Sequence, residues 1–269
     1  METGFFKIIK GNSPVIATAI HSGHHVRKEV SDKLLLTEDE RLREEDPFTE
    51  KFIRFSPTQI IVNSSRFEFD LNRIEEKAIY LTPAEAWGFT VWRERPSEKI
   101  IERSLSHYRK FYAEVKTLLN EYVSRYGEIF IYDVHSYNYR RKGPENDADD
   151  PEKNPDINIG TGNIDNEYWK NLIKDFKDDL SSFDIEGHKL DVRQNIKFKG
   201  GHFSRWINAN YGNRICVLSI EIKKIFMNEW TGEIFPDRFA LLKKAIQSTM
   251  PRVVKNLKSN FSEKRRNVI

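Results

Sequence analysis

Short apolar runs recur along the chain and alternate with longer amphipathic segments. The runs are rich in Ile and Val and most are bounded by Gly, Pro or Asn, which is typical of β-strands. Between them, apolar residues recur at three- and four-residue steps, the spacing of one helix face. The pattern predicts strands at residues 14–20, 58–63, 128–134, 156–161 and 214–222, and helices at residues 97–125, 166–180 and about 236–258.

The segment 97–125 has the clearest helical pattern, and its aromatic face is predicted to pack in the core rather than bind a cofactor. Ser97 is a suitable N-cap for this helix, and Gly127 a suitable C-terminal stop. In the last predicted helix, Pro251 is expected to kink or divide the helix because proline lacks a backbone N–H.

Strands that alternate with helices predict an α/β fold. We expect three layers, with a mixed, mostly parallel sheet and helices on both faces. The sequence has no internal repeat and no Gly/Ser-rich linker, so we expect a single domain over residues 1–269. Residues 140–155 are polar, acidic and contain proline, which predicts an exposed loop. This loop is either a flap over a site or an ordinary surface insertion.

Composition excludes several classes of protein. The 44 basic and 41 acidic residues give a net charge of +3, which is too balanced for a nucleic-acid-binding surface. No apolar stretch reaches the roughly 18–20 residues that span a bilayer. The N-terminus lacks the features of a signal peptide, and the single Cys216 cannot form an internal disulfide. We therefore expect a cytoplasmic protein that binds neither nucleic acid nor membrane; the sequence leaves its oligomeric state open.

Two histidines each follow an apolar run. His21 comes directly after residues 15–20, and His135 follows the run 129–132. Ligands and catalytic groups gather beyond the carboxyl ends of strands in α/β sheets, and histidine is the commonest metal ligand. The pair therefore predicts a divalent metal site at the edge of the sheet, with zinc as the expected ion.

A catalytic zinc site usually has a third protein ligand and one open position. Asp46 is the preferred candidate, with Glu45 and His24 as rivals. Asp46 precedes a proline, so it is alternatively a helix N-cap. Asp133 lies two residues before His135, on the same side of a strand, and is either an orienting partner for that histidine or a polar group at a strand end.

Other charged residues suggest the remaining chemistry. Glu221 lies within an apolar strand, where burial would raise its pKa toward that of a general base; alternatively, the strand ends there. Arg66 and Arg73 follow the strand 58–63. Arginine can bind carboxylates or stabilise an oxyanion, although surface ion pairs would explain both residues equally well.

Taken together, these segments resemble the N-formylglutamate amidohydrolase family, which has a zinc carboxypeptidase-like, phosphorylase/hydrolase-type α/β fold. The resemblance runs from about residue 14 to residue 224. The segments that match the family's pattern, in the family's order, are residues 19–23, 45–47, 65–66 with 70–73, 133–136, 200–201 and 220–222.

The resemblance implies a metal-dependent hydrolase that cleaves the amide of an N-acyl amino acid. N-formylglutamate would give formate and glutamate. The implied roles are zinc ligation by His21, Asp46 and His135, proton transfer by Glu221, oxyanion stabilisation or carboxylate binding by Arg66, and substrate binding by Asn72, Arg73, Gly201 and His202.

The chain also departs from the family's pattern. The helix 97–125 reads Lys110-Phe111-Tyr112 where the family often has a Tyr-His pair, and the acidic segment 144–155 is longer than expected. These departures leave the acyl group and the amino acid open. The alternatives are a zinc amidase or peptidase acting on another N-acyl amino acid, a short peptide or a cell-wall fragment, and a non-catalytic binding protein of the same fold.

Overall fold

A seven-stranded sheet organises the protein. The computed structural model describes residues 4–266, and the side chains of residues 4–258. The strand order is β1-β3-β2-β4-β9-β5-β8, and a separate hairpin pairs β6 with β7. The strands are β1 Phe6–Ile9, β2 Val15–Ala19, β3 Thr58–Val62, β4 Ile129–Tyr137, β5 Ile157–Gly160, β6 Asp184–Ile185, β7 His188–Lys189, β8 Val192–Gln194 and β9 Ile215–Lys223.

The centre of the sheet is parallel and its margins are not. Strands β3, β2, β4 and β9 run in one direction. Strand β1 runs antiparallel to β3, and β5 runs antiparallel to β9. The sheet is therefore mixed and mostly parallel, as predicted.

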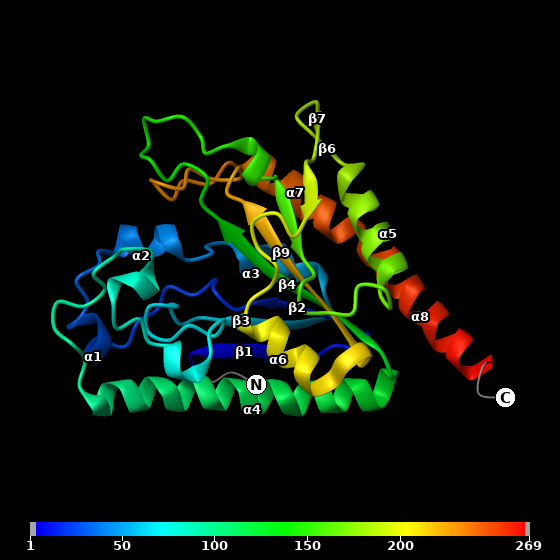
Figure 1. The fold of residues 1–269 in the computed structure, drawn as a ribbon, viewed down its shortest axis with the longest axis horizontal. Coiled ribbons are helices and arrows are strands. Elements are labelled where there is room, and N and C mark those ends of the chain that lie inside the picture. The colour runs from blue at the N-terminus through cyan, green and yellow to red at the C-terminus, as the bar shows by residue number, and fades with distance from the viewer. Residues whose placement is uncertain (1–3, 267–269) are drawn as a thin grey trace.

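Helices cover both faces of this sheet (Figure 1). Helices α4 and α6 lie on one side, and α5, α7 and α8 on the other. The helices are α1 Lys28–Ser31, α2 Glu38–Glu44, α3 Thr49–Phe52, α4 Glu98–Tyr126, α5 Lys170–Ser181, α6 His202–Tyr211, α7 Pro236–Ser248 and α8 Met250–Arg266. No helix among the described residues is long and apolar enough to cross a membrane.

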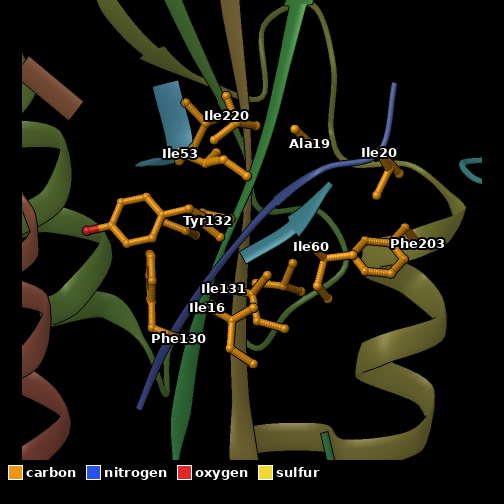
Figure 2. Close-up of a cluster of buried hydrophobic side chains, with 14 of the residues drawn as sticks. Ile16, Ala19, Ile20, Ile53, Ile60, Phe130, Ile131, Tyr132, Phe203 and Ile220 are labelled. Atoms are coloured by element: carbon orange, nitrogen blue, oxygen red, sulfur yellow. The ribbon is translucent and has the colours of Figure 1, made fainter. Parts of the chain in front are cut away.

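The core fills both spaces between the sheet and its helices. Neighbouring side chains of β4 point to opposite faces, with Phe130 and Tyr132 on one and Ile131 on the other (Figure 2). The rings of Phe130 and Tyr132 lie 5.8 and 5.6 Å from that of Phe176 on α5. Burial on both faces explains why the central strands read as continuous apolar runs.

Most of the predicted elements are confirmed. Helix α4 begins after Ser97, whose hydroxyl accepts a hydrogen bond from the N–H of Ile100, and it ends before Gly127, the C-cap, which has φ +76°. The last predicted helix is divided at Thr249, and Pro251 lies in the first turn of α8, where its missing N–H is tolerated. Cys216 is buried in β9.

Some boundaries and short elements were not predicted correctly. Strand β4 extends to Tyr137, so His135 lies inside it, and α5 begins at Lys170 rather than 166. Strands β1, β6, β7 and β8 and the helices α1, α2, α3 and α6 were missed. These segments are short and depend on tertiary packing rather than on a long periodic pattern.

Candidate active site

The four parallel strands end at the same edge of the sheet and bring the predicted residues together. His21 lies two residues beyond the end of β2. His135 lies two residues before the carboxyl end of β4, directly opposite Glu221 on β9. Because these two residues are register partners on parallel strands, their side chains face the same side of the sheet.

Close contact between two chain segments fixes the position of His21. After His21 the chain runs beside the end of β3, where Gly23 pairs with Ser65 and His25 pairs with Ser64. A Cβ atom on Gly23 would lie only 2.2 Å from the carbonyl carbon of Asn63. Glycine is therefore required at this point so that the two segments can approach each other.

Main-chain contacts direct Asp46 toward the histidines. Its N–H donates to the carbonyl of His21 at 3.0 Å, and its own carbonyl accepts from the hydroxyl of Thr49 at 2.6 Å. The N-cap of the following helix α3 is Phe48, which makes no side-chain capping bond. The carboxylate of Asp46 is therefore not a helix cap; it points to the imidazoles.

His21, Asp46 and His135 form a buried group whose possible ligand atoms all lie within 4.8 Å of one another. Asp46 Oδ2 is 3.0 Å from His135 Nδ1 and 3.4 Å from His21 Nδ1. Among the described residues, no other cluster of histidine, cysteine and carboxylate side chains has this geometry.

The second nitrogen of each imidazole meets another carboxylate. His21 Nε2 lies 2.8 Å from Asp70 Oδ1, and His135 Nε2 lies 3.2 Å from Asp133 Oδ2. With a metal ion bound at the two Nδ1 atoms, such carboxylates would orient each ring and favour the ring proton on Nε2. Two nitrogen donors and one carboxylate oxygen, each held in place, fit a divalent ion such as zinc.

Glu45 and His24, the rival third ligands, belong to a separate network. Glu45 Oε2 lies 2.6 Å from His24 Nδ1, and Glu45 Oε1 accepts a hydrogen bond from the hydroxyl of Ser65. Arg41 Nη1 lies 3.7 Å from the same carboxylate. Both oxygens of Glu45 are therefore already used outside the His21, Asp46 and His135 group.

Buried charges shift several pKa values in this region. Burial alone would raise the pKa of Asp46, but hydrogen bonds from His135 and His21 lower it well below its usual range. Burial also opposes the ionisation of His135, yet the carboxylates of Asp133 and Glu221 raise its pKa. Burial raises the pKa of Glu221 to about 7, although the nearby His135 opposes this shift. The site thus holds ionised Asp46 beside a carboxyl group that titrates near neutral pH.

These residues open onto a cleft of about 200 Å³. Most of its lining residues are charged or polar, and aromatic side chains complete the wall. The lining residues are His21, Glu44, Asp46, Arg66, Asp70, Asn72, Arg73, Trp87, His135, Ser136, Tyr137, Asn138, Arg141, Phe198, Glu221 and Lys224.

Asp70 links the metal candidates to Arg66. One oxygen of Asp70 faces His21, and the other accepts hydrogen bonds from Arg66 Nη2 at 2.7 Å and from the hydroxyl of Tyr80. Arg66 and His21 hold the pKa of this carboxyl well below its usual range, against the effect of burial. The guanidinium of Arg66 is therefore oriented by a fixed carboxylate at the wall of the cleft.

Arg73 is held mainly by neutral groups. Its Nη2 donates to the carbonyl of Glu85 at 2.8 Å, and its guanidinium lies 4.8 Å from the ring centre of Tyr80 and 6.0 Å from that of Trp87. Its nearest carboxylate oxygen, on Asp70, is 3.9 Å away. This arrangement leaves much of its positive charge available to a bound anion.

Asn72 supports the start of helix α6. Its Oδ1 accepts a hydrogen bond from the N–H of Phe203 at 3.0 Å, and its carbonyl accepts one from His202. A Cβ atom on Gly201 would lie 2.1 Å from this side chain. Gly201 and His202 do not line the cleft, but both contact Asn72, which does. Substrate binding by these three residues stays a prediction.

Part of the loop 140–155 reaches the cleft. Arg141 lines it and forms an ion pair with the buried Glu44, with Nη2 and Oε2 3.1 Å apart. The N–H groups of Tyr139 and Arg140 donate to Glu229. The beginning of the loop is thus anchored beside the site, and closure of the remainder over substrate stays a prediction.

Sequence reasoning assigned no role to Asp70, Trp87, Glu44 or Lys224, all of which line the cleft. Asp70 lies between Arg66 and Arg73 in the sequence, so the sequence shows that these residues are close. Its contact with His21 cannot be inferred from the sequence. Lys224 follows the predicted strand 214–222 and is buried. Glu44 belongs to the acidic segment that precedes Asp46, and Trp87 lies in a segment without a recognisable pattern.

One family model and two solved structures match the chain. A family model described as N-formylglutamate amidohydrolase matches residues 13–227. A solved N-formylglutamate amidohydrolase from Ralstonia eutropha is 18% identical, with a TM-score of 0.75 and coverage of 96% of this chain and 100% of that chain. A gene product from Agrobacterium tumefaciens is 16% identical, with a TM-score of 0.64 and coverage of 94% and 96%. No curated protein matches the sequence. The two solved structures support the fold.

Proposed function

Because the chain belongs to the N-formylglutamate amidohydrolase family and is a hydrolase of amide bonds, we propose that it uses a metal ion to cleave N-acyl amino acids. The preferred substrate type is N-formyl-L-glutamate, which water converts to formate and L-glutamate. The metal is one divalent ion, with zinc as the expected ion.

One observation carries the proposal: Asp46 Oδ2 lies between His21 Nδ1 and His135 Nδ1, and Glu221 is the register partner of His135. A zinc ion held by these three ligands would acidify water and polarise the acyl carbonyl. A carboxylate next to that position is what proton removal from the attacking water requires.

Glu221 would move the proton. In its ionised form it accepts a proton from the water whose oxygen bonds to the acyl carbon. It then donates this proton to the amine nitrogen as the carbon–nitrogen bond breaks. A pKa of about 7 allows both steps near neutral pH, because the carboxyl group both gains and loses a proton readily there.

Arginines would bind and orient the substrate. Arg73 faces the cleft with no tightly paired carboxylate, so it can bind the α-carboxylate of the amino acid. Arg66, held by Asp70 and Tyr80, shares the carboxylate of Asp70 with His21. It can stabilise the oxyanion that forms at the acyl carbon.

Product analysis with defined metal content tests this proposal. Zinc-loaded protein is expected to release formate from N-formylglutamate, and protein stripped with a chelator is expected to recover activity only when metal is restored. Panels of other N-acyl amino acids and short peptides show whether a different amide is preferred. Stoichiometric binding without turnover, unchanged in Glu221→Gln, would instead identify a non-catalytic binding protein and overturn the proposal.

A further inference from the structure

Trp87 is a partly exposed aromatic residue at the wall of the cleft. Of the five tryptophans, all of which lie in the described part of the chain, Trp87 alone lines the cleft. It is 44% exposed, although tryptophan is a large apolar residue. Aromatic side chains that remain open inside a polar cleft are typical of ligand-binding surfaces.

The ring of Trp87 lies against two arginines that line the same cleft. The guanidinium carbon of Arg66 is 4.8 Å from the ring centre, and that of Arg73 is 6.0 Å from it. Both arginines also approach one carboxylate oxygen, Asp70 Oδ2, at 2.7 Å for Arg66 Nη2 and 3.9 Å for Arg73 Nε. Two positive groups this close repel each other, whereas the electron-rich face of an aromatic ring attracts both. One carboxylate and one aromatic ring therefore hold both guanidinium groups at this wall.

A small hydrophobic cluster, separate from the main core, supports the ring from its edge. The ring centre of Trp87 is 5.7 Å from that of Tyr80 and 6.5 Å from that of Phe67, in edge-to-face contacts. Both partners are buried members of the cluster. The buried residues of this cluster are Leu34, Phe67, Tyr80, Ala86 and Val91. The cluster thus fixes one edge of the indole while nearly half of the residue stays exposed.

The main chain holds Trp87 in a left-handed conformation, with φ +52°. Bulky residues seldom adopt this region, and they do so where the surrounding structure enforces it. Here the N–H groups of Trp87 and Gly88 both donate to the carbonyl of Pro83. In the same turn, the carbonyl of Glu85 accepts a hydrogen bond from Arg73 Nη2 at 2.8 Å. The turn that fixes Trp87 is therefore attached to Arg73 itself.

We propose that Trp87 is a positioning residue for anion binding in this cleft. Its ring keeps the guanidinium groups of Arg66 and Arg73 together and shields them from water on one side. Because less water surrounds the guanidinium groups, they attract a bound carboxylate or a developing oxyanion more strongly. This inference rests on the proposed function, since it assigns the anionic groups of the substrate to these two arginines.

Replacing the indole with an apolar side chain that is not aromatic tests the proposal. Trp87→Leu should lower kcat/KM for N-formylglutamate by about five- to 30-fold, the effect of losing a partly desolvated cation–π contact. Trp87→Phe keeps an aromatic face and should retain most of the wild-type kcat/KM. Equal losses in the two variants would show that only the bulk of the indole matters and would overturn the proposal.

Tryptophan fluorescence gives a readout that does not depend on turnover. Butyrate bound by the two arginines would lie beside the indole of Trp87 and should change its emission. The change should persist in Trp206→Phe, because Trp206 lies on α6 outside the lining and packs against Tyr112. It should be lost in Trp87→Phe; an undiminished change in that variant would contradict the inference.

Calorimetry with butyrate separates this inference from the proposed function. Titrations of zinc-loaded and of chelator-treated protein allow binding to the metal to be subtracted. If wild-type protein hydrolyses no N-acyl amino acid, the proposed function fails, while butyrate binding that is about five- to 30-fold weaker in Trp87→Leu still supports the role of Trp87. Equal affinity of wild-type protein and Trp87→Leu overturns the inference even where hydrolysis proceeds. If Trp87→Leu does not fold, the comparison of emission between wild-type protein and Trp87→Phe decides.

Discussion

His135 and Glu221 lie directly opposite each other on the parallel strands β4 and β9. The pairing puts an imidazole and a buried carboxyl group on one side of the sheet, at the edge where His21 and Asp46 also lie. The proposed metal ligand and the proposed proton acceptor are thereby both held by the hydrogen-bonded centre of the sheet. Such preorganisation favours catalysis because little reorganisation is needed during the reaction.

The pKa of Glu221 predicts a pH dependence. Burial raises this pKa to about 7, and only the ionised carboxylate can accept a proton from water. We therefore expect kcat/KM to rise with pH through about 7. Glu221→Gln should lower kcat/KM by about 10²–10⁴-fold and remove this acidic limb from the profile measured between pH 5 and 9. The exposed Glu233→Gln serves as the matched control, and an acidic limb that persists in Glu221→Gln would assign it to another group.

The third metal ligand can be identified by comparing two adjacent carboxylates. Asp46→Asn should weaken zinc binding strongly, because it removes the oxygen shared by both Nδ1 atoms. Glu45→Gln should retain stoichiometric zinc, because Glu45 contacts His24 and Ser65 instead. Metal analysis and competition with a chromophoric chelator measure both variants. Retention of zinc in Asp46→Asn and loss in Glu45→Gln would reverse the assignment.

A variant of His135 tests the site as a whole. His135→Ala is expected to lose bound zinc, because it removes one of only two nitrogen donors from the group. His25→Ala is a suitable control, since it removes a nearby histidine that is not a member of this group. Elemental analysis of both purified proteins, with circular dichroism to verify folding, gives the answer. Unchanged metal content in folded His135→Ala would exclude the proposed site.

Asp70 is expected to tune the metal without binding it. Asp70→Asn keeps the shape of the side chain but removes the charge that faces both His21 and Arg66. Loss of such an orienting carboxylate typically costs ten- to 100-fold in metal affinity or activity, about the effect expected here. The zinc dissociation constant is the decisive measurement, because a role confined to Arg66 would lower activity and leave zinc affinity intact.

Arg73 should act on substrate binding. Arg73→Met is expected to lower kcat/KM for N-formylglutamate by about 10- to 100-fold, mainly through KM, because a charge-assisted contact with the α-carboxylate is lost. Arg109→Met removes an arginine that pairs with Glu75 and Glu102 on the surface and should change kcat/KM less than twofold. A loss in Arg73→Met confined to kcat would indicate that Arg73 serves the oxyanion instead.

The sequence by itself determined the strands that carry the site, helix α4 with its caps, and the membership of the family. Each of these depends on a local pattern: apolar runs for buried strands, a 3.6-residue period with Ser97 and Gly127 for α4, and residues in a fixed order along the chain. The same order placed His21, Asp46, His135 and Glu221 among the candidates. It did not establish which carboxylate completes the metal group, because Glu45 and Asp46 are neighbours in the chain.

Tertiary structure decided the contacts between distant segments. Asp46 reaches the histidines because its N–H is bonded to the carbonyl of His21, while the carboxylate of Glu45 is occupied by His24 and Ser65. Asp70 meets His21 across 49 positions, and Lys224 is buried because the main chain at residues 43–45 folds over it. Local sequence carries no signal for such contacts, because they form only when parallel strands bring the ends of separate segments to one edge of the sheet.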